Sequence, residues 1–192
     1  MTTRRAAVTL GWQLAVIGTS CRLLGTAQAQ TEADNTPPRL RSLLQSPRLI
    51  GQQRLTYWGF EVYDASLWAN TRFAPETWAT QTLVLELRYL RDFKGADIAK
   101  RSMDEMQGQK PLSATQQHTW SAMLQNLIPN VRVGDTLTGV YQPNKGMQLL
   151  HQDRLLGDLR DAELAQRFFG IWLAPETSQR QLRQQLLAGA QP

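Results

Sequence analysis

The chain of 192 residues contains one cysteine and two histidines, which are too few for a metal centre built from these ligands. It also lacks a glycine-rich phosphate loop, a Gly-x-Ser-x-Gly nucleophile turn and the histidine spacing of a hydrolytic metal site. The sequence therefore predicts no metal and no cofactor. His118 and His151 each stand alone, and for such histidines a structural or solvated role is expected in preference to general-base catalysis.

The formal net charge is +5, but residues 30–192 have only a small excess of positive charge. Residues 1–29 contain Arg4, Arg5 and Arg22 and no acidic residue, so they account for +3. The remaining 18 basic and 16 acidic residues leave only +2. A nucleic-acid-binding domain needs a basic patch in its folded part, so this distribution argues against nucleic acid as a partner.

The start of the chain has the order of features that is typical of an export signal. Two early arginines are followed by a mostly apolar run over residues 6–24, and small side chains then occupy the −3 and −1 positions of a cut after Ala29. The sequence thus predicts a signal peptide over residues 1–29, a periplasmic or secreted mature protein, and membrane contact only through this signal. An uncleaved anchor and a twin-arginine signal are the alternatives. Cleavage would also remove Cys21, the single cysteine.

The remainder of the chain is expected to consist of a flexible linker over residues 30–40 and one domain over residues 41–190. Patterns of apolar and β-branched residues predict strands at 48–57, 60–69, 82–90, 135–141, 146–151 and 154–159. Helical periodicity predicts helices at 95–106, 115–128, 161–173 and 177–187, the last with Thr177 as its N-cap. Because strands and helices come in blocks, the sequence predicts an α+β fold with an antiparallel sheet and helices packed on one face.

Arg54 is the most conspicuous charged residue of the predicted strands, because large side chains such as Leu55 and Tyr57 surround it. Two placements are open. The guanidinium is either a charge on an edge strand that reaches water, or an anion-binding group inside a cavity. In a cavity it must have a partner, since arginine is not neutralised by deprotonation, and a carboxylate or phenolate is the natural one.

A stripe of aromatic residues occupies the helix predicted at 161–173. Phe168, Phe169 and Trp172 recur at the spacing of one helical face. Such a stripe either packs in a core or forms the wall of an apolar ligand pocket, and both interpretations stay open.

Several motifs, taken in order, resemble those of the chalcone isomerase-like superfamily. The first is Leu-Ile-Gly-x-x-Arg at residues 49–54, followed by Phe-Glu-Val-Tyr-Asp-Ala-Ser-Leu-Trp at residues 60–68. Later segments resemble its strand-to-helix passage and its exported bacterial members; they lie at residues 88–102, 134–141 and 155–173. The resemblance covers most of residues 40–188.

This resemblance implies an open-faced sandwich, in which a large antiparallel sheet carries helices on one side and a ligand cleft lies between them. Arg54 matches an arginine that holds an anionic oxygen in the plant enzymes. Tyr63 falls where those enzymes have a threonine and where non-enzymatic relatives often have tyrosine. Phe168 and Phe169 fall near residues that line the far side of the cleft. The resemblance therefore implies these four residues as the ligand-binding set.

The same resemblance includes a departure from the plant enzymes, which have a Tyr-x-x-Lys pair where residues 112–123 of this chain contain neither type. It thus favours an exported, non-catalytic binder of a fatty acid or a similar amphipathic anion, and it assigns no catalytic residue. One alternative is an isomerase of the intramolecular lyase type that uses Arg54 and Tyr63 to stabilise an oxyanion. A second is an envelope interaction module that has no ligand.

Overall fold

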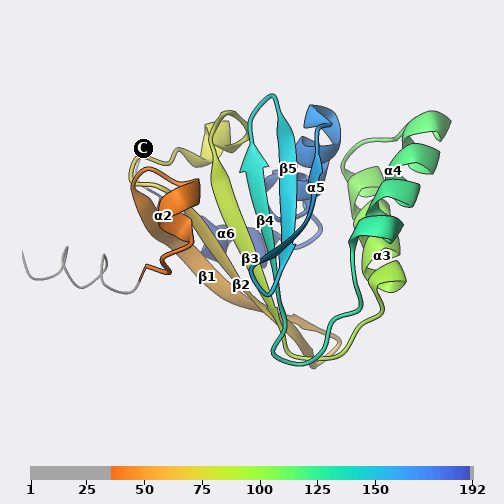
Figure 1. Cartoon of the computed structure of the whole chain (residues 1–192), viewed down its shortest axis with the longest axis horizontal. Helices are drawn as coiled ribbons and strands as arrows, with labels where there is room; N and C mark the ends of the chain where they lie inside the picture. Colours follow the sequence, from red (N-terminus) through yellow and green to blue (C-terminus); the bar gives the residue numbers. More distant parts are fainter. Residues whose placement is uncertain (1–35, 191–192) are drawn as a thin grey trace, which may run out of the picture.

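A six-stranded antiparallel sheet forms the centre of the part of the chain that the computed structural model describes, residues 36–190 (Figure 1). Neighbouring strands are consecutive in the sequence throughout the sheet. They are β1 (Pro47–Tyr57), β2 (Phe60–Asn70), β3 (Leu83–Tyr89), β4 (Thr136–Gln142), β5 (Gly146–His151) and β6 (Arg154–Leu159). The expected signal peptide lies outside the described residues.

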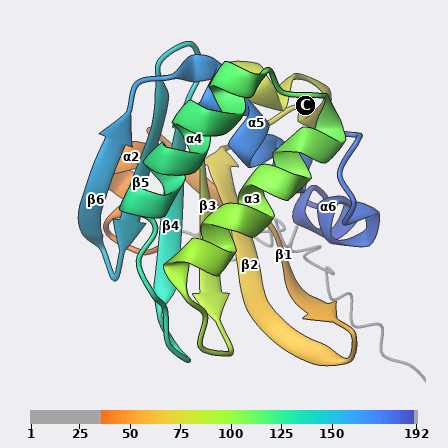
Figure 2. The same cartoon turned by 90° about the vertical axis from the view of Figure 1, so that its right-hand side faces the viewer.

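A layer of helices covers one face of this sheet (Figure 2). Its members are α3 (Gly95–Gln109), α4 (Ala114–Leu127), α5 (Ala162–Leu173) and α6 (Arg180–Leu186). Helix α3 packs against α4 and α5, α5 packs on β4 and β5, and α6 packs on β1. This arrangement confirms the predicted α+β fold, an antiparallel sheet with a helical layer on one face. Within residues 36–190, no helix combines the length and the apolar character that crossing a membrane would require.

The long helices begin where the sequence supplies side-chain caps. Ser113 and Gln116 form a reciprocal capping box at the start of α4. The carboxylate of Asp161 accepts a hydrogen bond from the backbone N–H of Leu164 at 2.9 Å and thereby caps α5. These caps fix the points at which the chain turns from loop into the helical layer.

Thr177 does not cap α6, which begins at Arg180 with Gln179 at its N-cap position. The Thr177 hydroxyl instead donates to the carbonyl of Ile171 at 2.5 Å and accepts from the backbone N–H of Gln179 at 3.1 Å. The expectation that Thr177 is the N-cap is therefore wrong. The side chain is buried and satisfies backbone groups of the connection between α5 and α6.

The main core lies between the sheet and the helical layer, and Phe169 of α5 is fully buried within it. Gly139 of β4 makes room for this ring, because a Cβ atom at that position would lie 2.8 Å from the Phe169 Cζ atom. The Phe169 ring also packs against Tyr141, with ring centroids 5.3 Å apart. Helix α5 is thus seated directly on β4.

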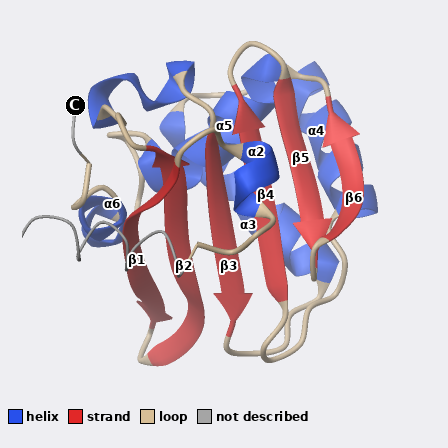
Figure 3. Cartoon of the chain, turned by 60° about the vertical axis from the view of Figure 1, so that its left-hand side comes forward, coloured by secondary structure: helices blue, strands red, loops and turns tan. Residues whose placement is uncertain are grey.

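A short helix, α2 (Leu40–Leu43), packs on the opposite face of the sheet (Figure 3). Leu40 and Leu44 are buried there against Val84 and Val140. The flexible linker was expected over residues 30–40, and Leu40 at the end of that range is buried against the sheet. The 3₁₀ helix η1 (Pro75–Thr80) is a second short element that the sequence patterns did not predict.

Candidate functional site

An apolar cleft of about 330 Å³ lies between the sheet and the helical layer. Its floor is formed by strand residues, which include Leu85, Leu87, Leu137 and Leu149. Its opposite wall comes from α3 and α5 and includes Ile98, Phe168, Phe169 and Trp172. Phe168 and Phe169 thus line this cleft, and the aromatic stripe both packs in the core and lines a pocket.

Two tyrosine hydroxyls bring hydrogen-bonding capacity into this apolar surface. Tyr63 of β2 is buried and accepts a hydrogen bond of 2.9 Å from the indole Nε1–H of Trp172. Because this bond uses the Tyr63 oxygen as acceptor, the hydroxyl proton remains available for donation. Tyr89 of β3 lies beside it, with ring centroids 5.8 Å apart. Among residues 36–190, no group forms a hydrogen bond with the Tyr89 hydroxyl.

Both tyrosines stay protonated at neutral pH. Burial raises the pKa of Tyr63 well above its ordinary value, while the hydrogen bond from Trp172 opposes this shift. Burial likewise raises the pKa of Tyr89. The cleft thus presents neutral phenols as hydrogen-bond donors, and such donors suit a carbonyl or carboxylate oxygen.

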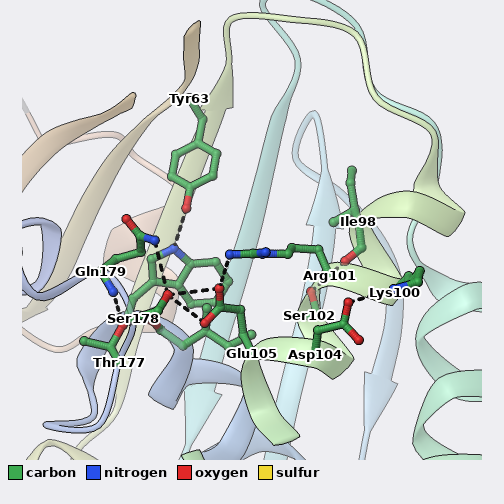
Figure 4. A network of polar contacts seen from close by, with 12 residues as sticks. Tyr63, Ile98, Lys100, Arg101, Ser102, Asp104, Glu105, Thr177, Ser178 and Gln179 are labelled. Atoms are coloured by element: carbon green, nitrogen blue, oxygen red, sulfur yellow. Dashed lines mark hydrogen bonds and ion pairs between the residues drawn. The ribbon is translucent and has the colours of Figure 1, made fainter. Parts of the chain in front are cut away.

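A polar cluster marks the edge of the cleft beside α3 and the start of α6 (Figure 4). The Arg101 guanidinium forms an ion pair with Glu105 at 2.5 Å. The Ser178 hydroxyl lies 2.8 Å and 3.0 Å from the two Glu105 carboxylate oxygens. The Arg101 side chain is 56% exposed and that of Glu105 13%, so the cation is open to solvent while the carboxylate is largely enclosed.

Arg54 lies on the other face of the sheet and does not line the apolar cleft. Its Nε donates to Asp64 Oδ1 at 2.7 Å, its Nη2 donates to Asp64 Oδ2 at 3.0 Å, and its Nη1 donates to Glu61 at 2.6 Å. These hydrogen bonds, those to Asp64 most of all, raise the pKa of Arg54 further. The Arg54 side chain is 43% exposed. Of the two placements left open by the sequence, the structure has the edge-strand charge that reaches water.

Strand register explains why Arg54 and Tyr63 face opposite ways. Arg54 pairs with Asp64 across β1 and β2, and Leu55 pairs with Tyr63. Cross-strand partners share a face of the sheet, so Leu55 and Tyr63 face the cleft while Arg54 and Asp64 face away. A β-bulge at Ile50 sets this phase, because the register steps from Leu49↔Trp68 to Gly51↔Leu67. Without this bulge, strict alternation from the buried Ile50 would put Arg54 on the core side.

Three functional candidates were missed at the level of the sequence, namely Tyr89, Arg101 and Glu105. Tyr89 falls in the strand predicted at 82–90, and an apolar strand pattern does not distinguish a core position from a cleft position. Arg101 and Glu105 are spaced four residues apart on α3, which places them on one helical face. This spacing was the available signal, since Ile98 also belongs to the same face and lines the cleft.

The histidines lie outside the cleft. His118 is exposed on α4, and His151 Nε2 lies 3.0 Å from Asp135 Oδ2 near the end of β5. The described residues contain no group of three or more His, Cys, Asp or Glu that is arranged to hold a metal ion. The chemistry available in the cleft is therefore that of two phenols, one half-exposed arginine and the carboxylates at its edge.

Comparisons with known proteins agree with this fold. The sequence model described as chalcone isomerase-like matches residues 51–188. A protein of Haemophilus influenzae, described as an uncharacterized protein, is 30% identical over 138 residues, which are 72% of this chain and 66% of that protein's length. The crystal structure of an Arabidopsis thaliana fatty-acid binding protein superposes with a TM-score of 0.58 and 10% identity. The match covers 74% of this chain and 87% of the plant chain.

The structural match at 10% identity establishes a shared fold. The family match covers residues 51–188, which contain the whole sheet from Gly51 onward and every helix of the helical layer. On the strength of that match, the chain belongs to the chalcone isomerase-like family.

Proposed function

We propose that this protein binds a fatty acid or a similar amphipathic molecule in the apolar cleft, and that it acts as a binder outside the cytoplasm. The observation that carries the proposal is an apolar cleft that holds two neutral phenol hydroxyls, those of Tyr63 and Tyr89. The volume of about 330 Å³ falls within the usual range of small-molecule pockets. The fatty-acid binding protein of Arabidopsis thaliana, which has the same fold, supports a ligand of this class.

The apolar part of the ligand would lie against the leucines of the sheet and the aromatic rings of α5. Burial of a hydrocarbon chain contributes about 0.8 kcal/mol for each CH₂ group, so a few methylene groups give useful affinity. Phe168 and Phe169 would supply much of this surface, since both lie on the wall of the cleft. This apolar half of the site discriminates between ligands by the length and shape of their hydrocarbon chain more than by their functional groups.

The polar end of the ligand would accept hydrogen bonds from Tyr63 and, when it is anionic, would approach Arg101. Trp172 polarises the Tyr63 hydroxyl by donating to its oxygen, and a chain of such bonds strengthens each member. Arg101 replaces Arg54 as the cation nearest to the ligand in this proposal. The isomerase alternative required Arg54 and Tyr63 to act on one oxyanion, and their opposite orientations remove the basis for it.

A displacement titration tests this proposal. The purified protein is loaded with a fluorescent fatty-acid analogue, which is then displaced with unlabelled fatty acids of increasing length. Ile98→Trp fills the cleft from α3 and should weaken binding at least about tenfold, because lost methylene burial accumulates. Lys100→Trp is the matched control, since Lys100 is exposed on the same helix and should leave affinity unchanged.

Thermal melts of both variants show whether the fold is kept. Saturable binding that Ile98→Trp weakens and Lys100→Trp preserves supports the cleft as the site. If the wild-type protein shows no saturable binding, or binds equally well after Ile98→Trp in a folded protein, the proposal is wrong. The first of these results would favour the interaction module without ligand.

A further inference from the structure

The hairpin between β1 and β2 ends in exposed aromatic side chains. Tyr57, Trp58 and Phe60 are 49%, 84% and 58% exposed, and we call these three residues the aromatic tip. Tyr57 and Phe60 are cross-strand partners, and the rings of Tyr57 and Trp58 have centroids 6.2 Å apart. Large apolar side chains that gather on a surface mark a place of interaction more often than isolated ones do.

The geometry of the turn gives no reason for Trp58. Trp58 has φ +52° and Gly59 has φ +78°, so both central residues of the turn lie in the left-handed region. Two-residue turns of this kind favour asparagine, aspartate or glycine, and a bulky residue in that region carries a conformational cost. Since neither the turn nor the core uses the indole, its role is to be sought at the surface.

Positively charged residues lie in two connections at the same end of the sheet as the aromatic tip. Arg91 and Lys94 lie in the connection from β3 to α3, and Arg132 lies in the connection from α4 to β4 (Figures 1 and 2). All three are exposed, and none forms an ion pair within residues 36–190. The Arg91 guanidinium lies 4.5 Å from the centroid of the Phe60 ring, which joins the cations to the aromatic tip.

Two acidic residues of this region are bound by other groups, whereas Asp97 is an exposed carboxylate in the first turn of α3. Glu61 forms an ion pair with Arg54 at 2.6 Å, and Asp92 accepts a hydrogen bond from the backbone N–H of Val133 at 2.9 Å. Val133 itself is 65% exposed and adds an apolar side chain to this end of the molecule. The resulting surface combines exposed aromatic rings with unpaired cations.

We propose that the aromatic tip, together with Arg91, Lys94 and Arg132, docks onto the surface of a membrane that contains anionic lipids. Tryptophan and tyrosine favour the membrane–water interface, where a ring meets both apolar and wet surroundings. Lysine and arginine near such a surface are attracted to anionic headgroups. The two kinds of side chain found here are those that interfacial binding requires.

The aromatic tip lies beside the cleft, which connects docking on a membrane with ligand binding. Tyr57 belongs to the aromatic tip and also lines the cleft, and Arg101 lies over its ring at 5.6 Å. A protein seated on a membrane through the tip would therefore bring the edge of its cleft to the lipid surface. Exchange of a lipid between membrane and cleft rests on the proposed function, whereas docking itself does not.

Flotation with vesicles tests the docking. The full protein is mixed with vesicles of phosphatidylcholine alone or of phosphatidylcholine with phosphatidylglycerol, and the bound fraction is measured. The wild type should partition more strongly to the anionic vesicles. Trp58→Asn should weaken this partitioning about tenfold, since it removes a side chain that anchors at the interface. Asparagine is also a favoured residue at this position of the turn. Leu155→Asn is the control, because Leu155 is an exposed residue of the distant edge strand β6.

A double variant, Lys94→Gln with Arg132→Gln, measures how much of the vesicle binding comes from electrostatic attraction to anionic lipids. Each cation removed should lower partitioning to the anionic vesicles about fivefold and leave binding to phosphatidylcholine unchanged. Equal partitioning by wild type and a folded Trp58→Asn protein would overturn the proposal, as would a lack of binding to anionic vesicles. Self-association that depends on Trp58, without vesicle binding, would overturn it in favour of a second copy of this chain.

The failure of docking and the failure of ligand binding are distinguishable. Fatty-acid displacement in the absence of vesicles should give the same affinity for Trp58→Asn as for wild type, because Trp58 does not line the cleft. Loss of vesicle binding alone by this variant supports the docking surface. Loss of fatty-acid affinity as well would show that the substitution disturbs the cleft, and it would contradict a separate docking role.

Discussion

The indole N–H of Trp172 donates a 2.9 Å hydrogen bond to the hydroxyl of Tyr63, although the two residues are 109 positions apart in the sequence. This bond joins helix α5 to strand β2 across the cleft. It also orients the phenol. The Tyr63 oxygen accepts the hydrogen bond from Trp172, so the hydroxyl proton of Tyr63 points away from the indole.

Removal of the Tyr63 hydroxyl should weaken the binding of carboxylate ligands. A hydrogen bond to a charged group contributes about 1.5–3 kcal/mol, so Tyr63→Phe should lower fatty-acid affinity about ten- to a hundredfold. Tyr141→Phe is the matched control, since the Tyr141 hydroxyl donates to the carbonyl of Ala79 at 2.8 Å outside the cleft. Titration of both variants with the same fatty acid checks this, and equal affinities would exclude Tyr63 as a ligand contact.

Arg54 should be dispensable for the ligand, whereas Arg101 should contribute. Arg54→Gln removes a cation from the far face of the sheet and should leave fatty-acid affinity unchanged. Arg101→Gln removes a half-exposed cation at the cleft and should weaken a fatty acid about two- to fivefold, as expected for an exposed pair.

Glu105→Gln should strengthen fatty-acid binding. It releases Arg101 from its ion pair and removes a negative charge that repels the carboxylate of the ligand. A fatty alcohol of equal chain length serves as the neutral control ligand, and neither Arg101→Gln nor Glu105→Gln should affect it. A fatty-acid affinity that falls with Arg54→Gln and not with Arg101→Gln would reverse this assignment.

Alkaline pH should destabilise the protein through its buried phenols. The folded-state pKa values of Tyr63 and Tyr89 are raised above the ordinary value of 10.0, mainly by burial. The contribution of these two phenols to the free energy of unfolding is therefore fully present below about pH 10. It is lost as the pH rises towards the folded-state pKa values, because the unfolded chain releases these protons first.

Urea unfolding of wild type and of the double variant Tyr63→Phe with Tyr89→Phe, followed across this range of pH, measures the contribution. The free energy of unfolding of the wild type should fall more steeply above about pH 10 than that of the variant. Parallel curves for the two proteins would show that these hydroxyls do not cause the loss.

Two glycines should respond in opposite ways to alanine. A Cβ atom on Gly51 would lie 2.2 Å from the Gln185 carbonyl oxygen of α6, so Gly51→Ala should cost about 1–3 kcal/mol of stability through overpacking. Gly108 lies within α3 with no atom close to its would-be Cβ, so Gly108→Ala should stabilise by about 0.5–1 kcal/mol. Chemical denaturation of both variants checks the signs, and stabilisation by Gly51→Ala would contradict the close approach of α6 to β1.

Much of the fold was accessible from the sequence because its elements are long and periodic. All six strands were expected within a few residues of their observed bounds, and so were the helices of the layer. Helix α2 was not expected, since a helix of four residues has too few turns to show a period. Its buried Leu40 lies directly after a polar stretch that contains proline, and this composition is typical of a linker.

The candidate site was harder to predict, because one inserted residue changes which face a side chain occupies. The bulge at Ile50 leaves no clear signal in a single sequence, and it decides which of the two open placements Arg54 takes. Tyr63, Phe168 and Phe169 were placed at the cleft by resemblance to a family. Arg101 was missed because helix charges are usually solvated, so its position beside a cleft depends on how α3 packs.

Native mass spectrometry of the protein purified from its natural host, followed by organic extraction, tests the central claim most directly. The account predicts a protein species with the added mass of a fatty acid or similar lipid, and that molecule in the extract. The same spectrum should show a mature chain that begins near Gln30, as the predicted signal peptide requires. A protein that carries no added mass, yields no lipid on extraction and fails to take up a supplied fatty acid would contradict the account.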